Sequence, residues 1–298
     1  MPIPEQQLST WSNQGATVSA QATYNSVRTA LSADTSPIQG MDYEVYLQGS
    51  YRNDTNVRAD SDVDIVVQYN AIFGHNISAL PAAQSQLFDA QFSNAIYLWV
   101  HFRTHVLMAL RAYYGYGSVT EASRCLKVAA APGRVPGDVV PAIPFRNYGY
   151  FYGQNGQSYS EGIRFEDQNG RVIVNYPRQH YDNGVAKNSA GRTAGRFKRT
   201  VRMLKNARTR AVERGFLADG VASSYFLDCL IWNAPDNLFA ENLQNTYCGI
   251  VNHLNGAVLT GYSCRNGIVP LFGTSPEQWT DLKARQLLAG LVRLWNEW

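Results

Sequence analysis

Two aspartates in the stretch SDVDIVV, Asp62 and Asp64, have the residue type and the spacing to do chemistry. The β-branched residues around them predict a buried strand. Side chains alternate between the two faces of a strand, so both carboxylates project to the same side. Two like charges placed this way are unfavourable unless a cation lies between them.

A hard divalent cation is the natural partner of such a pair. Mg²⁺ takes oxygen ligands, typically one or two carboxylates together with water and substrate phosphates. A third acid, Asp138, opens the strand-like run DVVPAIPF, and it joins Asp62 and Asp64 if the two strands pair. Three carboxylates can hold two Mg²⁺ ions, the arrangement that serves phosphoryl and nucleotidyl transfer. The alternative is that Asp138 is a turn residue and that the other two are solvated strand ends.

The segment Gln48-Gly49-Ser50 has the composition of a phosphate-binding turn. It lies between the strand-like run YEVYL and a polar loop. A glycine lets backbone N–H groups approach a phosphate closely, and the hydroxyl of the serine adds a donor.

A sheet and a set of helices must position these residues. Strand-like patterns cover 43–49 and 61–69, and two hairpins are predicted over 123–150 and 163–177, the second with a turn at Asn169-Gly170. Helical spacing covers 17–33, 82–114, 190–215, 222–233 and 276–298. We therefore expect a mixed α/β first half followed by a mostly helical second half.

Positive charge is concentrated in one predicted helix. Residues 192–214 hold nine Lys or Arg residues and a single acid, Glu213, which suits a ligand that carries phosphates. Lys198, Arg202 and Lys205 fall on one stripe of this helix. For Lys198 and Arg202 a solvated basic face is the alternative.

The motifs together resemble a known family. GSYRNDTNVRADSDVDIVV, followed by GDVVPAIPFRNY, closely resembles the signature GS…DxD…D of the nucleotidyltransferase superfamily. Within it, the sequence is similar to the bacterial cGAS/DncV-like nucleotidyltransferases (CD-NTases), which are cyclic-oligonucleotide synthases. Segments 173–188, 196–208 and 223–235 resemble later motifs of that group, and the likeness is greatest to the clade E-like subgroup that accepts pyrimidine nucleotides.

The resemblance implies an α+β fold. Residues 1–183 would form a nucleotidyltransferase core of the DNA polymerase β type, with a mixed sheet and an N-terminal helix. Residues 184–298 would form a C-terminal helical domain.

The resemblance also implies roles for single residues. Asp62, Asp64 and Asp138 would be catalytic and would bind two Mg²⁺ ions, for which Mn²⁺ can substitute. Nucleotide-binding roles fall to Gln48, Gly49 and Ser50, and to two residues of the second half. Lys205 matches a lysine that contacts the donor triphosphate, and Ser224 matches a serine that reaches the phosphates, while Ser223 is the better helix N-cap.

Asn175 is the position most informative about the substrate. It aligns with a lid position that reads the edge of the base in the resembled family. An amide can donate and accept at once, which suits uracil. The alternative is that Asn175 caps a turn before Pro177. His180 and Asn183 follow closely and could shape the same pocket, although a structural role suits His180 better.

The implied activity is that of a cyclic dinucleotide synthase. It would join ATP, UTP or other NTPs with release of pyrophosphate, and its product would be a second messenger for an effector protein in antiphage (CBASS-type) signalling. One alternative is a transferase acting on an RNA 3′ end or a small acceptor, which a net charge of +3 disfavours. Another is a non-catalytic nucleotide-binding module, which has no need of three clustered acids.

Composition sets further expectations. No apolar run approaches the roughly 18 residues of a membrane span, and the N-terminus shows no signal peptide, so we expect a cytoplasmic protein. We also expect a monomer without a stable nucleic-acid partner. The four cysteines form no CxxC pair, and we expect them to be reduced and structural.

Overall fold

The computed structural model describes residues 1–57, 62–275 and 277–298. The chain divides into two compact units. The sheet unit consists of Thr17–Tyr51 and Ser61–Pro177; the helical unit consists of Met1–Ala16, the described part of Arg52–Asp60, and Arg178–Trp298. We expected a core over 1–183 and a helical domain over 184–298, whereas here the first sixteen residues and the segment after Tyr51 group with the helices.

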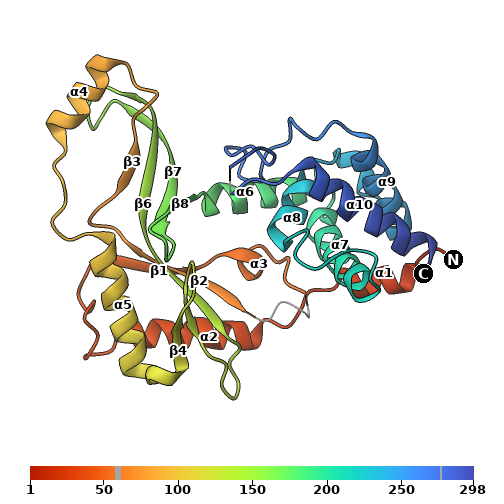
Figure 1. The fold of residues 1–298 in the computed structure, drawn as a ribbon, viewed down its shortest axis with the longest axis horizontal. Helices are drawn as coiled ribbons and strands as arrows, with labels where there is room; N and C mark the ends of the chain where they lie inside the picture. The colour runs from red at the N-terminus through yellow and green to blue at the C-terminus, as the bar shows by residue number, and fades with distance from the viewer. Residues whose placement is uncertain (58–61, 276) are drawn as a thin grey trace. The chain divides into compact units, whose positions relative to one another are not determined.

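A mixed sheet forms the frame of the sheet unit (Figure 1). Its main path runs β1-β2-β6-β5-β4, with bounds Tyr43–Leu47, Val63–Tyr69, Gly137–Phe151, Leu126–Val128 and Val119–Glu121. β2 is antiparallel to β1 and parallel to β6, while β5 is antiparallel to β6. The predicted mixed-sheet core is therefore confirmed.

The sheet is stabilised by the apolar residues that make up most of β2. Val63, Ile65 and Val67 of β2 are fully buried. Two helices, α2 (Val18–Leu31) and α5 (Trp99–Tyr114), join these strands in one hydrophobic core. This core holds β2 and β6 in fixed register.

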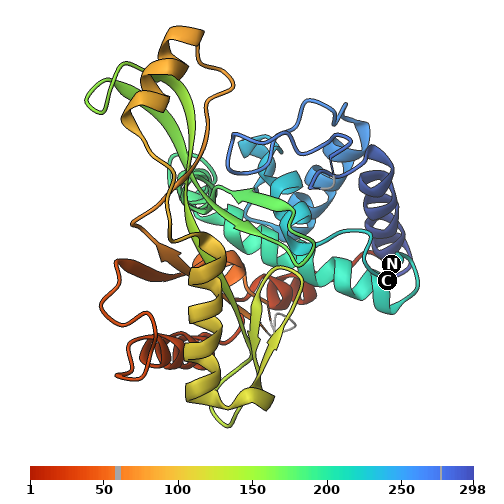
Figure 2. The same ribbon diagram turned by 60° about the vertical axis from the view of Figure 1, so that its left-hand side comes forward.

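A second, smaller core lies at the far end of β6. There β6 pairs with β3 (Gly74–Asn76) and β7 (Gln157–Glu166), and β7 pairs with β8 (Val172–Asn175). Together with α4 (Ala82–Gln91) these strands form an extension of the sheet unit, visible in both orientations (Figures 1 and 2). Phe88 and Phe151 are central to its core.

Both predicted hairpins are confirmed. β5 pairs with β6 across the first turn region, and β7 pairs with β8 across Asn169-Gly170. Gly170 has a φ of +74°, which favours glycine.

The single helix predicted over 82–114 is wrong. α4 ends at Gln91 and α5 begins at Trp99. Phe92 adopts an extended conformation with φ −123° and ψ 140°, and its ring packs on Phe88. Ser93 and Asn94, which compete with helical backbone bonding, follow directly.

Helices dominate the helical unit (Figure 1). Their bounds are α1 Glu5–Ser12, α6 Pro177–Asn188, α7 Arg196–Glu213, α8 Ser224–Trp232, α9 Leu243–Gly256 and α10 Asp281–Asn296. Short 3₁₀ helices cover Tyr116–Ser118 in the sheet unit and Asp236–Leu238 here. The sequence patterns missed α1, α6 and α9; α6 begins at Pro177, a residue that fits the first helical turn.

Two predicted elements begin outside the described residues. Ser61 opens the predicted strand 61–69, and Pro276 opens the predicted last helix. Within the described part of the chain, no helix is both long enough and apolar enough to span a bilayer.

Candidate active site

The parallel pairing of β2 and β6 brings two acids together. Asp64 and Asp138 are register partners, so their side chains leave the same face of the sheet. Asp62 lies two residues before Asp64 and, by alternation, on the same side. We call Asp62, Asp64 and Asp138 the carboxylate cluster. Two adjacent backbone segments, β2 with the residue before it and β6, position the cluster, and no long loop is needed.

A lysine that sequence reasoning missed lies among these acids. Lys127 on β5 is the register partner of Asp138. Its Nζ is 3.5 Å from Oδ2 of Asp62 and 3.6 Å from Oδ1 of Asp138. The carboxylate of Asp138, and then that of Asp62, raises the pKa of Lys127, against the opposing effect of desolvation.

The glycine of the Gln48-Gly49-Ser50 segment is packed against Asp64. Gly49 has a φ of +63°, and a Cβ added there would lie 1.9 Å from Oδ2 of Asp64. The backbone N–H of Gln48 donates to the carbonyl of Asp64 over 2.9 Å. The structure therefore places this segment, with half-buried Ser50, directly beside the carboxylate cluster. Only glycine fits at position 49, for conformation and for space.

A thiol completes the surroundings of Asp138. Burial and the neighbouring Asp138 carboxylate raise the pKa of Cys125 to about 12. The thiol is therefore neutral at physiological pH, and it leaves the charge of the cluster unchanged.

The residues present fit divalent metal bound jointly with a phosphate ligand. Oδ1 of Asp138 is shielded from solvent and has no hydrogen-bond partner in the described part of the chain, and a buried anionic oxygen of this kind gains from a nearby cation. Among the described residues no group of three or more His, Cys, Asp or Glu side chains could hold a metal ion as a ready-made cage. Mg²⁺ needs no such cage when phosphates and water supply the remaining ligands.

Asn175 is the last residue of β8 and is exposed. It is the register partner of Ile163 on β7. The neighbouring Gly162 allows a close approach, because a Cβ there would lie 2.6 Å from the carbonyl oxygen of Asn175 and 3.0 Å from the ring of Tyr176. The side-chain amide of Asn175 is therefore carried by a backbone segment that pairs with β7.

In the helical unit, the basic stripe of α7 binds the segment that follows Asn53. Nζ of Lys198 is 2.7 Å from Oδ2 of Asp54, and Arg202 donates to the carbonyls of Asp54 and Ser12. A solvated basic face for Lys198 and Arg202 is therefore wrong. Lys205 is 1% exposed.

Nζ of Lys205 donates to the carbonyl of Thr55 over 2.9 Å. Together with Lys198 and Arg202 it fixes the backbone of 54–55 on α7. Its contact with a triphosphate stays a prediction.

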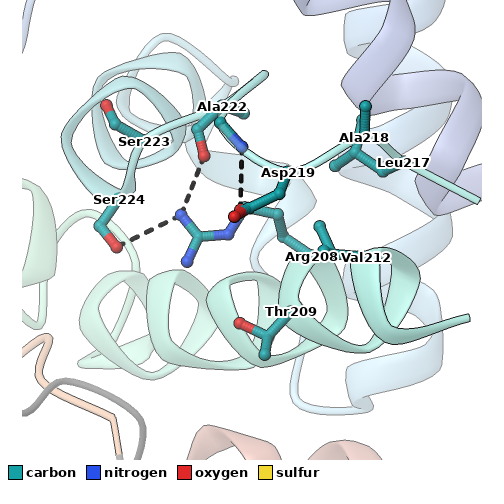
Figure 3. Close-up of a pocket in the computed structure, with 10 residues that line it drawn as sticks. Arg208, Thr209, Val212, Leu217, Ala218, Asp219, Ala222, Ser223 and Ser224 are labelled. Carbon is teal, nitrogen blue, oxygen red and sulfur yellow. Dashed lines mark hydrogen bonds between the residues drawn. The ribbon is translucent and has the colours of Figure 1, made fainter. Parts of the chain in front are cut away.

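Ser224 lines a pocket of the helical unit of about 350 Å³ (Figure 3). Its hydroxyl accepts from Nη1 of Arg208 over 3.3 Å, and the same nitrogen donates to the carbonyl of Ala222 over 3.0 Å. Figure 3 shows the guanidinium of Arg208 between these two acceptors. Ser223 accepts from the N–H of Phe226 over 3.2 Å, which confirms it as the N-cap of α8. No sequence pattern distinguishes Arg208 from the other basic residues of this helix.

Comparison with known proteins connects both units to one family. Residues 27–88 match the nucleotidyltransferase domain, and residues 182–296 match the cGAS/DncV-like nucleotidyltransferase C-terminal helical domain. A "Cyclic UMP-AMP synthase" of Rhodothermus marinus is 44% identical over 302 residues, covering 100% of this chain and 99% of that protein. The chain belongs to the cGAS/DncV-like nucleotidyltransferases.

Two further comparisons agree with this family. "Cyclic nucleotide synthase CdnE01" of Staphylococcus haemolyticus is 36% identical, with 100% of both chains covered. The solved structure of the Rhodothermus marinus CdnE c-UMP-AMP synthase with Apcpp and Upnpp superposes with a TM-score of 0.88 at 43% identity. That superposition covers 100% of this chain and 98% of the other, so the family fold extends over the whole of this nucleotidyltransferase.

The helical unit of this CD-NTase is organised around a fully buried arginine, Arg265. Nη1 of Arg265 donates to both oxygens of Asp228 over 2.7 and 2.8 Å, Nη2 donates to Asn53, and Nε donates to the carbonyl of His180 over 2.9 Å. Asn183 donates to the carbonyl of Arg265 over 2.8 Å.

His180 and Asn183 therefore hold Arg265 in place. Burial, with a further contribution from Arg265, lowers the pKa of His180 well below its usual range. Its ring stacks on Tyr225 at a centroid distance of 5.1 Å, and the structural role expected for His180 is confirmed.

Proposed function

We propose that this chain is a metal-dependent cyclic dinucleotide synthase that joins two NTPs, at least one of them UTP, and releases pyrophosphate. The register pairing of Asp64 with Asp138, beside Gly49, carries the proposal. It places anionic oxygen ligands next to a segment that can approach a phosphate. The relatives named as cyclic UMP-AMP and cyclic nucleotide synthases support this choice of product class.

The carboxylate cluster would hold two Mg²⁺ ions, or Mn²⁺ in their place, which neutralise the triphosphate and lower the pKa of the attacking hydroxyl. Gly49 and Ser50 would bind the donor phosphates through their backbone N–H groups and the Ser50 hydroxyl, and Gln48 would hold them there through its own N–H, which donates to the carbonyl of Asp64. Lys205 and Ser224 of the helical unit are further candidate donors to a nucleotide triphosphate. None of these groups changes its covalent state, so catalysis depends on positioning and on charge.

The reaction is two successive in-line substitutions. A ribose hydroxyl of the acceptor nucleotide attacks the α-phosphorus of the donor; a P–O bond forms, and the bond to pyrophosphate breaks. The linear product then turns within the site, and its remaining triphosphate reacts with the free hydroxyl of the other ribose. Asp138, the second residue of β6, is the carboxylate that orients the attacking hydroxyl.

Asn175 would read the base of the UTP. Its exposed amide can accept from N3–H and donate to O4 of uracil. The support from β7 behind it keeps the amide in place. A cyclic product that contains uridine would act as a second messenger for a cyclic-nucleotide effector protein in antiphage (CBASS-type) signalling.

The test is incubation of the purified protein with all four labelled NTPs and Mg²⁺, followed by phosphatase treatment. Each NTP is omitted in turn, and the double variant D62N/D64N serves as the inactive control. We expect a phosphatase-resistant product that disappears when UTP is omitted. Linear, phosphatase-sensitive products alone would overturn cyclisation and favour a transferase that extends an acceptor.

The role of Asn175 has its own matched comparison. N175S should reduce UTP use relative to ATP use by about tenfold, the value of one lost base-edge hydrogen bond. N155S alters an exposed asparagine in the turn between β6 and β7 and should leave the ratio unchanged. An unaltered ratio in N175S would remove Asn175 from base recognition and leave the proposed reaction intact.

A further inference from the structure

Lys127 lies where two acids of the carboxylate cluster can share its charge. Its ammonium is within 3.6 Å of oxygens from both Asp62 and Asp138. Strand pairing brings Lys127 to these acids. β5, β6 and β2 are adjacent strands that carry Lys127, Asp138 and Asp64 in register.

A nearby cation stabilises the carboxylate cluster. Three carboxylates on one face repel each other. Oδ1 of Asp138 is buried without a hydrogen-bond partner among the described residues. The positive charge nearest to it in this set of contacts is Nζ of Lys127, at 3.6 Å.

The distances and the exposure of Lys127 indicate that its ammonium group can be displaced easily from the carboxylate cluster. Both contacts are longer than a charge-assisted hydrogen bond of about 2.8 Å. The side chain is 48% exposed, so its ammonium can turn into solvent while its methylene stem stays on the sheet. Lys127 is thus bound to the cluster by charge more than by a fixed hydrogen bond.

We propose that Lys127 is the counter-cation of the carboxylate cluster in the metal-free protein and competes with divalent metal for Asp62 and Asp138. This inference rests on the proposed function, since it takes the cluster to be the metal site. Displacement of the ammonium accompanies metal entry, and it raises the metal concentration at which the site fills. Lys127 therefore protects the folded metal-free enzyme and sets its threshold for metal.

The test uses three single variants of the full chain. K127M removes the charge and keeps the length of the side chain, and K127R keeps the charge. K283M makes the same charge change at an exposed position of α10. Mn²⁺ binding to the nucleotide-free proteins is measured by electron paramagnetic resonance of free Mn²⁺, and melting temperatures are measured with and without Mn²⁺.

We expect K127M to bind Mn²⁺ about three- to tenfold more tightly than the wild type, a range that one unit charge near the site produces in a watery environment. K127R and K283M should stay within about twofold of the wild type. Without metal, K127M should melt at a lower temperature than the wild type, and saturating Mn²⁺ should remove that difference. A purely structural lysine would give a deficit that Mn²⁺ does not remove.

Unchanged or weaker Mn²⁺ binding by K127M overturns the inference. The D62N/D64N variant separates this failure from failure of the proposed function. If the wild type binds Mn²⁺ and D62N/D64N does not, the metal site stands whatever K127M shows. If the wild type and D62N/D64N bind Mn²⁺ equally, the metal site and the role of Lys127 both fall.

Discussion

Asp64 on β2 and Asp138 on β6 are register partners on parallel strands, so the spacing of their carboxylates is set by the sheet. Both strands belong to the apolar core of the sheet unit, in which Val63, Ile65 and Val139 are fully buried. A site built on strands in this way is more rigid than one built on loops. The consequence is that changing either carboxylate should alter chemistry and leave folding intact.

Replacing Asp64 or Asp138 with asparagine should lower the rate of pyrophosphate release by about three orders of magnitude, because an amide keeps the volume but loses the charge that metal and phosphate require. The melting temperature should not fall, since removing one of several like charges relieves repulsion. D89N, on an exposed face of α4, is the matched control and should keep wild-type activity. Retention of activity in D64N or D138N would exclude that carboxylate from the reaction.

Gly49 should tolerate no side chain. G49A must strain a φ of +63° and must push a Cβ into Oδ2 of Asp64, so we expect at least a hundredfold loss of activity, on the order of the penalty for misplacing a catalytic group by 1 Å. G40A carries the same backbone strain, with a φ of +77°, but its Cβ would meet open space.

Comparing the two glycine variants separates strain from displacement. G40A should lose about 1 kcal/mol of stability and keep its activity. If the two variants lost activity equally, strain alone would account for the effect and the contact with Asp64 would not matter.

The positions of the carboxylates could be predicted from the sequence for a clear physical reason. Alternation along SDVDIVV fixes the side on which Asp62 and Asp64 project, and a hairpin whose second strand opens at Asp138 has few ways to join that sheet. The Gly49-Ser50 segment could also be predicted from local chemistry. Its backbone turns with a φ of +63° at position 49, a conformation that favours glycine, and a glycine followed by a serine is visible in the sequence.

The contacts of basic residues could not be predicted in the same way. Lys127 is a single lysine in a short strand, and only the observed register of β5 on β6 brings it to Asp138. Helical periodicity placed Lys198, Arg202 and Lys205 on one stripe, but their partners are backbone carbonyls and a carboxylate of a distant segment. Such contacts between distant segments depend on tertiary structure, which helix and strand propensities do not specify.

Breaking the buried pair of Arg265 and Asp228 should destabilise the protein by about 3–5 kcal/mol, because the remaining charge is left without its partner away from water. R265M and D228N are the variants, measured by urea unfolding. The matched control is R293M, which removes an ion pair with Glu297 in which the arginine side chain is 54% exposed. It should cost no more than about 0.5 kcal/mol. If R265M lost no more than about 0.5 kcal/mol of unfolding free energy, Arg265 would contribute through packing and not through its ion pair with Asp228.

The stability of the helical unit should fall in acid through Asp236. Its carboxylate accepts from Nε of Arg192 at 2.6 Å and pairs with Nζ of Lys187 at 2.9 Å. Burial alone would raise the pKa of Asp236, but the hydrogen bonds from Arg192 and Lys187 outweigh it, and the pKa is lowered. A carboxyl with a lowered pKa contributes stability above its unfolded pKa of about 3.9, and that stability is lost as pH falls through the folded value.

The free energy of unfolding of D236N should therefore lie about 1–2 kcal/mol below that of the wild type at pH 7. The gap should hold down to about pH 4 and close as the pH is lowered further, because Asp236 is then protonated in both states of the wild type. Urea unfolding at a series of pH values measures this gap, with D89N as the control for a change of net charge. If the difference in unfolding free energy persisted unchanged at the lowest pH, the shape of the asparagine side chain would cause the destabilisation of D236N. The charge of Asp236 would then contribute nothing.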